Sequence, residues 1–423
     1  MTGPTPPAAR ASLPRRRVLA IVALVVVPVM LAALAGEIAL LFRERRVMRP
    51  MGGAPFAVFR PDDRLTVLRL RKAGTPFYPF VGPYQFGFRT HPAADPHSML
   101  FPLSGISTTP TQLCAADGQE VRYVSDEHGF ANPPGAWNGP LELALIGDSF
   151  VQGFCVYTEN QIGTGIRRAI PRTLNLGVVG AGPLIELAIL REYAAPLRPG
   201  RVLWFFYEGN DVEDLTIETN SPLAAYFDRN FSQRLFARQD SIDLVLRRFA
   251  DSTLAAEVRL NPLLSELAGV FVLRRVRAAM GFVAANAPGM SSRREYPALE
   301  RVLLMAKREV ADWGGEIIFV YLPDYHRFDS RVMSFAGWVH NNNEVHRRAV
   351  GAARAAGMPV IDVSAAFTAD PNPRRFWTTP ASHYGPEGYE MVVRTVLQAL
   401  DSASRPHPRS QQRDGVSQQR DRD

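Results

Sequence analysis

The sequence predicts an α/β domain, a three-layer α/β/α sandwich with a mostly parallel five-stranded sheet, preceded by an N-terminal transmembrane helix. From Leu141 onward, short apolar runs recur without the alternation typical of half-exposed strands. Turn residues and then an amphipathic segment follow each run, which indicates parallel strands joined by right-handed crossovers. The five runs are LELALIG, TLNLGVV, RVLWFFYEG, GEIIFVYLP and MPVIDVS.

Helices are predicted between and after these runs, and one interval is much longer than the others. Residues 212–315 separate the third run from the fourth and include SIDLVLRRFADSTLAAEVRL and ELAGVFVLRRVRAAMGFVAA. This helical insertion is either an amphipathic layer packed on the sheet, a cap over a site, or a membrane-facing surface. The shorter helices are predicted at 159–170, 183–193, 297–313, 343–356 and 386–400.

The rest of the chain differs in composition from the main domain, which is predicted at 141–401. Residues 1–17 are rich in Pro, Ala and Arg, and residues 402–423 are rich in Arg, Gln, Asp and Ser, so both tails are predicted to be disordered. Residues 43–140 are rich in Pro, Gly and aromatic residues without long helical periodicity. This segment is predicted to be irregular, β-rich decoration of the main domain.

A membrane anchor is predicted at residues 18–42, because this stretch is uncharged from 18 to 36 and apolar again after Glu37. The alternatives are a cleaved signal peptide, suggested by the small residues Ala33 and Ala35, and a twin-arginine signal. Arginines flank both ends of the span in similar numbers, so the positive-inside rule does not decide its orientation. The short preceding tail favours a single-pass bacterial inner-membrane protein with a periplasmic or other extracytoplasmic domain.

Charge and cysteine content exclude some classes of protein. The net charge is +7, carried almost wholly by arginine, but no stripe of arginine and aromatic residues typical of a nucleic-acid binder is present. Nucleic-acid binding is therefore not expected. The two cysteines, Cys114 and Cys155, either pair in an oxidising compartment or are unrelated buried thiols.

Residues that can carry chemistry follow three of the predicted strands, where the carboxyl ends of parallel strands form sites. A serine hydroxyl follows the first strand, glycines that permit close backbone approach follow the second, and an Asn-Asp pair follows the third. A histidine lies far downstream, just before the last helix. These residues are Gly147, Asp148, Ser149, Gly177, Gly180, Gly182, Asn210, Asp211 and His383.

The motifs GDSF, NLGVVG, GND and ASHYG, in this order, resemble the four sequence blocks of the SGNH or GDSL-type hydrolase superfamily. The segment SDEHGFANPPG also resembles bacterial membrane-anchored members. The resemblance covers residues 121–400 and implies a flavodoxin-like fold. It also implies Ser149 as nucleophile, His383 as base, and an oxyanion hole of Ser149, Gly180 and Asn210, with Gly182 as the alternative glycine. Asp148 and Asp211 are implied as supporting residues, with Asp148 bracing the turn.

The chain departs from the family where the triad acid is expected. That acid commonly lies three residues before the histidine, and Pro380 occupies the position here. Three alternatives remain: a Ser–His dyad oriented by a backbone carbonyl, an acid from elsewhere such as Asp324 or Asp370, or a site without catalysis.

The sequence therefore predicts a membrane-anchored ester hydrolase or O-acetyltransferase acting on O-acyl, mainly O-acetyl, groups of cell-envelope glycans. The alternatives are an inactive glycan- or partner-binding protein and a lipase or thioesterase acting on lipid acyl chains. No metal is expected, since the histidines are scattered. No cofactor is expected, because GVVGAGP lacks the spacing of a dinucleotide loop.

Overall fold

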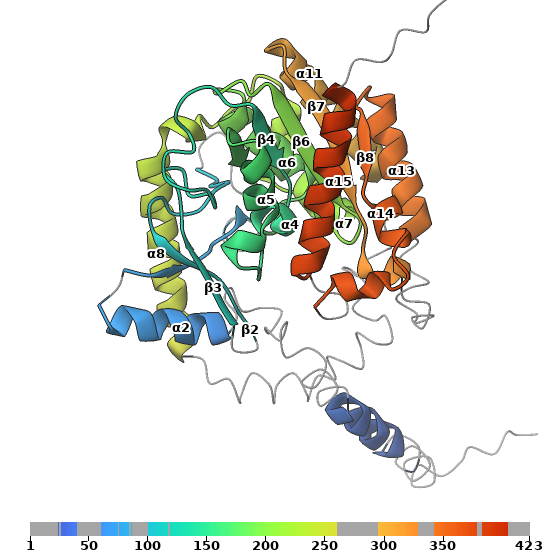
Figure 1. Cartoon of the computed structure of the whole chain (residues 1–423). Helices are drawn as coiled ribbons and strands as arrows, with labels where there is room; N and C mark the ends of the chain where they lie inside the picture. Colours follow the sequence, from blue (N-terminus) through green and yellow to red (C-terminus); the bar gives the residue numbers. More distant parts are fainter. Residues whose placement is uncertain are drawn as a thin grey trace, which may run out of the picture. The chain divides into compact units, whose positions relative to one another are not determined.

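The computed structural model divides the chain into two compact units, drawn in Figure 1. The first unit comprises Met1–Gly135, Thr216–Glu295 and Val332–Asn341, and the second comprises Ala136–Leu215, Tyr296–Arg331 and Asn342–Asp423. The residues that the structure describes are 24, 27–39, 61–74, 76–83, 86, 100–116, 119–259, 295–328, 342–378 and 383–404.

The second unit is built on a five-stranded sheet in which every neighbouring pair is parallel. The sheet order is β5-β4-β6-β7-β8, so β4, the first strand of this sheet along the chain, lies between β5 and β6. This is the order of flavodoxin-like doubly wound sheets, and ligands bind such sheets where the order reverses, here at the carboxyl end of β4. All five predicted strands are confirmed: β4 (Leu143–Ile146), β5 (Thr173–Asn175), β6 (Arg201–Tyr207), β7 (Glu316–Leu322) and β8 (Val360–Asp362).

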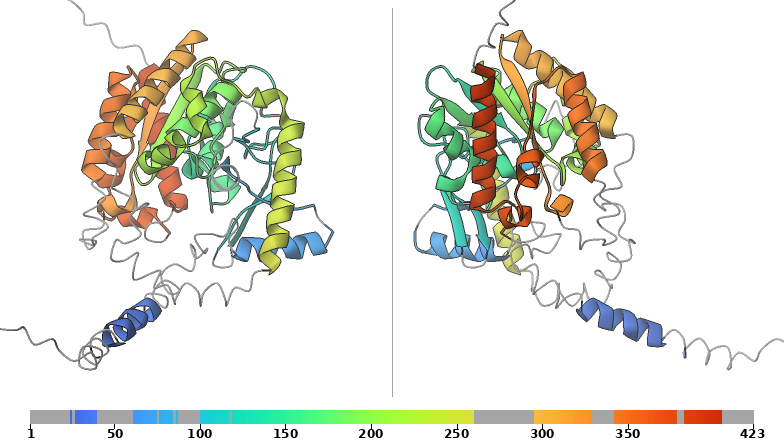
Figure 2. Two further views of the ribbon diagram at one scale, coloured as in Figure 1. Left: turned by 180° about the vertical axis from the view of Figure 1, so that it is seen from behind. Right: turned by 45° about the vertical axis from the view of Figure 1, so that its right-hand side comes forward.

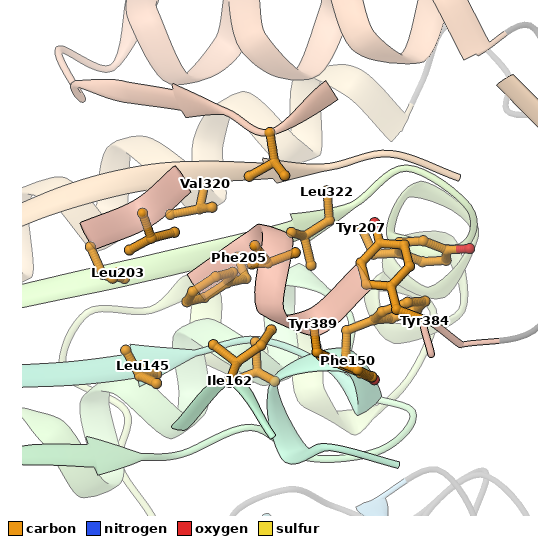
Figure 3. Close-up of a cluster of buried hydrophobic side chains, with 14 of the residues drawn as sticks. Leu145, Phe150, Ile162, Leu203, Phe205, Tyr207, Val320, Leu322, Tyr384 and Tyr389 are labelled. Atoms are coloured by element: carbon orange, nitrogen blue, oxygen red, sulfur yellow. The ribbon is translucent and has the colours of Figure 1, made fainter. Parts of the chain in front are cut away.

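Helices cover both faces of this sheet because alternate strand residues project to opposite sides and nearly all are buried. One face packs against α5 (Ile162–Ala169) and α15 (Pro386–Ser404), and Figure 3 shows this core. On the opposite face lie α11 (Glu295–Asp312) and α13 (Asn342–Ala355), which stand in front of the sheet in the left view of Figure 2. The remaining helices of this unit include α4 (Ser149–Gln152), α6 (Pro183–Ile189) and α14 (Ser364–Thr368).

Local sequence explains where these helices begin and end, and where the predicted bounds were wrong. Prolines, which lack an N–H and suit the first helical turn, open α6 and α15. Helix α5 begins later than predicted, since Gln161 is extended and separates it from a 3₁₀ turn at Thr158–Asn160. Helix α15 continues to Ser404, past the predicted end at 400 and into the predicted tail.

The first unit contains a three-stranded sheet of β1 (Tyr78–Pro79), β2 (Pro110–Ala116) and β3 (Gln119–Val124), with β2 and β3 antiparallel. These strands agree with the predicted β content of residues 43–140, but α2 (Pro61–Lys72) was not predicted. The aspartates of α2 lie in its first turn and basic residues lie in its last turn, an arrangement that the helix dipole favours. This charge pattern could have predicted the helix from the sequence. Helix α8 (Gln239–Arg259) confirms the first predicted helix of the insertion, and Arg71 pairs with Asp251 across these two helices at 2.7 Å.

Several predictions fall wholly or partly outside the described residues. Of the predicted anchor, residues 24 and 27–39 are described and helical, and no helix in the described ranges is both long and apolar enough to cross a membrane. The tail at 1–17, the second predicted helix of the insertion and nearly all of 402–423 lie outside the described ranges. Neither Cys114 nor Cys155 is a free thiol.

Candidate active site

Ser149 is the first residue of α4, and Gly147 and Asp148 separate it from the end of β4. Asp148 caps this short helix, because its Oδ1 accepts a hydrogen bond from the Phe150 N–H at 2.9 Å. The Ser149 hydroxyl also lies 3.3 Å from Asp148 Oδ2. The Asp148 side chain thus braces the turn that presents Ser149, as the family resemblance implied.

His383 and Ser149, 234 residues apart in the chain, are brought into direct contact. The distance from His383 Nε2 to Ser149 Oγ is 2.7 Å, within the range required of a nucleophile and its general base. His383 lies just before α15, so the end of β4 and the start of α15 supply the two partners. This contact can transfer a proton from the serine hydroxyl to the imidazole.

The glycine loop after β5 packs tightly against α4. Gln152 Oε1 accepts a hydrogen bond from the Val179 N–H at 2.7 Å, and Asn175 Nδ2 donates to the Val151 carbonyl at 2.8 Å. Gly180 has a φ of +74°, a left-handed conformation that favours glycine. The loop that carries the predicted oxyanion glycine is therefore held by two buried amide side chains, one on α4 and one on β5.

Substitution of Gly177 by Ala is expected to destabilise the protein by about 1–3 kcal/mol, because the new methyl group overpacks this contact. An ideal Cβ at Gly177 would lie 2.4 Å from the Gln152 nitrogen and 2.6 Å from the Val151 carbonyl carbon, and both are backbone atoms. Gly351 in α13 is the matched control, since no atom lies within 4 Å of its ideal Cβ. Thermal unfolding should show a lower melting temperature for Gly177→Ala and a slightly higher one for Gly351→Ala. Equal changes in melting temperature would contradict overpacking at Gly177.

Asn210 and Asp211 follow β6 at the same edge of the sheet. Asp211 is buried, and its Oδ2 accepts a hydrogen bond from the Tyr207 N–H at 2.7 Å, so it supports the turn. Asn210 Nδ2 donates to Asp214 Oδ2 at 2.6 Å. An amide nitrogen carries two N–H donors, so one bond to Asp214 orients the group and leaves the second for a ligand.

Substitution of Asn210 by Ala is expected to lower kcat for ester hydrolysis by about 10²–10³-fold with little change in KM, as for other oxyanion donors. Removal of the exposed Asn230 side chain provides the control. Steady-state kinetics on a soluble acetyl ester measure both parameters. A kcat for Asn210→Ala equal to that of Asn230→Ala would exclude Asn210 from the oxyanion hole.

Three carboxyl groups near Ser149 and Asn210 have raised pKa values; Asp148 and Asp211 are buried and Asp214 is partly buried. Burial raises the pKa of Asp148 to about 7, although hydrogen bonds from Phe150 and Ser149 oppose the shift. Burial likewise raises the pKa of Asp214 to about 7. The pKa of Asp211 lies well above its usual range, through burial first and then through the nearby Glu186 and Asp148. At a given pH, the folded protein therefore holds more protons on these carboxyl groups than the unfolded chain does.

The free energy of unfolding is expected to fall as the pH rises from about 4 to about 7. Over this interval the folded protein retains protons on Asp148 and Asp214 that the unfolded chain, with a carboxyl pKa of 3.8, has released. Asp148→Asn keeps an oxygen to cap α4 but does not titrate, so its unfolding free energy should decline less steeply. Denaturant unfolding across this pH range measures the two slopes; identical slopes would contradict a raised pKa at Asp148.

The two carboxylates suggested as substitutes for the missing triad acid have other partners. Asp370 binds Arg375 at 3.0 Å. Asp324 Oδ1 accepts a hydrogen bond from the Tyr207 hydroxyl at 2.7 Å, and its Oδ2 lies 2.8 Å from His326 Nδ1. Pro380 lies outside the described residues.

Comparison with known proteins gives matches among solved structures only. No family model and no curated protein matches the sequence. A lipase/acylhydrolase from Enterococcus faecalis is 15% identical, with 63% of this chain and 99% of that chain covered and a TM-score of 0.35. The chain is similar to GDSL-type lipolytic proteins.

Two further solved structures also match part of this chain. A lipolytic G-D-S-L family protein from Veillonella parvula DSM 2008 is 12% identical, covering 62% of this chain and 98% of its own, with a TM-score of 0.34. An acetyl xylan esterase is 9% identical, covering 61% of this chain and 98% of its own, with a TM-score of 0.35. At such identities the role of each residue rests on the geometry of this chain.

Sequence reasoning missed several residues that shape this site. Gln152 and Asn175 hold the glycine loop, and Phe150 and Phe154 lie against the His383 ring. Asn175 lies at the end of β5, and asparagine is depleted in strands, so its presence there could have indicated a special role. The aromatic contacts had no comparable signal, since large apolar residues next to a motif are common in any core.

Proposed function

We propose that this protein is a serine ester hydrolase or acyltransferase of the SGNH type. The observation that carries the proposal is the 2.7 Å contact between His383 Nε2 and Ser149 Oγ, beyond the carboxyl end of β4. A serine hydroxyl becomes nucleophilic when an adjacent base accepts its proton. The capped turn at Asp148 and the tightly packed glycine loop hold the surrounding backbone in place, which such a site requires.

The reaction proceeds through a covalent acyl-enzyme. His383 accepts the proton of Ser149 as Oγ forms a bond to the acyl carbon, and the carbonyl oxygen becomes an oxyanion. The N–H groups of Ser149 and Gly180 and the Asn210 amide donate hydrogen bonds to it. The ester bond then breaks, and His383 gives its proton to the departing alcohol. Water, or the hydroxyl of an acceptor, then attacks the acyl carbon and loses its proton to His383. The bond between the acyl carbon and Ser149 Oγ breaks, His383 gives that proton to Oγ, and the carboxylic acid or the new ester leaves.

The substrates that we propose are O-acyl, chiefly O-acetyl, groups on cell-envelope glycans, reached by an extracytoplasmic domain on a membrane tether. The tether is supported by the apolar sequence of residues 18–42 and by the exposed side chains of its described helical residues. These exposed residues are Leu24, Val27, Val29, Met30, Leu31 and Ile38. A reporter enzyme fused after Asp423 tests the orientation, and cytoplasmic reporter activity would contradict it.

Acyl-chain profiling tests the activity and the substrate class together. Purified protein is assayed on soluble esters from acetyl to palmitoyl and on O-acetylated polysaccharide, with Ser149→Ala as the blank. Highest kcat/KM on acetyl esters, together with acetate release from the polysaccharide, is the expected result. Preference for long chains would instead indicate a lipase or thioesterase, and no turnover by folded wild type would indicate a binding protein.

A further inference from the structure

The imidazole of His383 lies against the side chains of Phe150 and Phe154, which closely follow Ser149 in the chain. The centroid of its ring is 4.5 Å from that of Phe150, with 34° between the ring planes, and 5.0 Å from that of Phe154, with 44° between the planes. Both phenylalanines are buried. Because interiors are close-packed, the two rings restrict the rotation of the imidazole about its side-chain bonds.

Phe150 is itself held in place through Tyr207 at the end of β6. The two rings stack with centroids 4.0 Å apart and 29° between their planes. The Tyr207 hydroxyl donates a hydrogen bond of 2.7 Å to Asp324 Oδ1, and Asp324 is 4% exposed. Figure 3 shows the rings of Phe150, Tyr207 and Tyr384 gathered at one end of the sheet.

Tyr384, the residue after His383, provides a second connection between His383 and the segment that contains Asp324. Its ring is buried, and its hydroxyl donates a hydrogen bond of 2.6 Å to the carbonyl oxygen of Pro323. Pro323 precedes Asp324 in the chain. The contacts therefore form a closed circuit from His383 through Phe150, Tyr207, Asp324, Pro323 and Tyr384 back to His383.

The turn that contains Asp324 is rigidly held. The Asp324 N–H donates to Glu208 Oε2 at 2.8 Å, and Arg327 Nε donates to the same carboxylate oxygen at 3.0 Å. Burial alone would raise the pKa of Asp324, but hydrogen bonds from His326 and Tyr207 lower it below its usual value, so the group stays ionised. An ionised carboxylate is a strong acceptor for the Tyr207 hydroxyl.

We propose that Phe150, Tyr207, Asp324 and Tyr384, here called the imidazole frame, position the His383 ring for proton transfer with Ser149. This inference rests on the proposed function, and it makes Asp324 a positioning residue that acts through aromatic packing. A general base must be oriented within a fraction of an ångström, and small misplacement can cost up to about 10²-fold in rate. The imidazole frame meets this need by fixing the ring through Phe150 and its backbone through Tyr384.

The first test removes one hydroxyl from the imidazole frame. Tyr384→Phe keeps the ring but loses the bond to Pro323, and kcat on an acetyl ester should fall about 10-fold with KM within about 2-fold. Tyr389→Phe is the matched control. Tyr389 is equally buried in the same core, and its hydroxyl has no hydrogen-bond partner among the described residues. Equal kcat in the two variants would overturn the proposal.

The second test asks whether the two arms of the imidazole frame act as one unit. Tyr207→Phe breaks the bond to Asp324, and the double variant with Tyr384→Phe should lose less activity than the product of the two single losses. Strictly multiplicative losses would mean independent residues and contradict the circuit. Melting temperatures of all variants separate a loss of folded protein from a loss of turnover per folded molecule.

A measurement without turnover keeps this proposal separate from the proposed function. In ¹⁵N-histidine-labelled protein, the His383 ring signals are assigned by their loss in His383→Gln. In wild type they should report one ring environment, and Tyr384→Phe should broaden or split them, whereas Tyr389→Phe should not. Unchanged signals in Tyr384→Phe would overturn the imidazole frame even in an active enzyme. Inactive wild type with the expected spectral change would contradict only the esterase activity.

Discussion

Substitution of Ser149 by Ala is expected to lower kcat for ester hydrolysis by about 10⁴-fold or more. The variant lacks the oxygen that attacks the acyl carbon, so no acyl-enzyme forms. Binding and the oxyanion donors remain and sustain only the residual rate typical of serine hydrolases without their nucleophile. Initial rates on an acetyl ester, measured at high enzyme concentration, give the size of the loss.

The fold should tolerate this change. Ser149 contributes one hydroxyl, which contacts Asp148 and His383, and Asp148 can still cap α4 through the Phe150 N–H. A melting temperature close to that of wild type is therefore the control that separates chemistry from stability. Activity within tenfold of wild type would mean that Ser149 is not the nucleophile.

The second large effect is expected for His383→Gln, with a loss in kcat of about 10⁴-fold. Glutamine retains a hydrogen-bonding side chain but cannot accept a proton from Ser149 and return it to the leaving alcohol. Groups that act as a unit are strongly non-additive, so the double variant Ser149→Ala/His383→Gln should be no slower than Ser149→Ala alone. The same ester assay on the three variants measures this.

A multiplicative loss in the double variant would contradict a shared proton transfer and assign the two residues separate roles. The structure argues against separate roles because the two side-chain atoms are 2.7 Å apart and come from opposite ends of the domain sequence. Wild-type-like melting of the His383→Gln variant is the required control, since His383 also packs against Phe150 and Phe154.

The sheet and the Ser149–His383 pair were predictable from sequence for the same physical reason. Strands buried on both faces must be continuously apolar, and the residues that end such strands meet at one edge of the sheet. The apolar runs before Ser149 and Asn210 therefore predicted both the strands and the edge of the sheet at which the candidate site lies. His383 was predicted from its motif, because no periodicity links a loop to a strand so far upstream.

The rest of the site depends on contacts that leave little trace in a sequence. Tyr384 donates to a backbone carbonyl, and any residue at position 323 would supply one. The stacking of Phe150 on Tyr207 joins side chains on different elements, and each alone reads as an ordinary core residue. Asp324 was considered only as a direct partner of His383, whereas its oxygens contact Tyr207 and His326.

Covalent labelling by a fluorophosphonate tests the central claim, that Ser149 is a nucleophile activated by His383, most directly. Full-length protein is incubated with the reagent, digested, and searched by mass spectrometry for the phosphonylated peptide. The expected result is one adduct on Ser149, absent from Ser149→Ala and formed far more slowly in His383→Gln, at equal folded fractions. No adduct on folded wild type, or equal labelling of the His383→Gln variant, would contradict the claim.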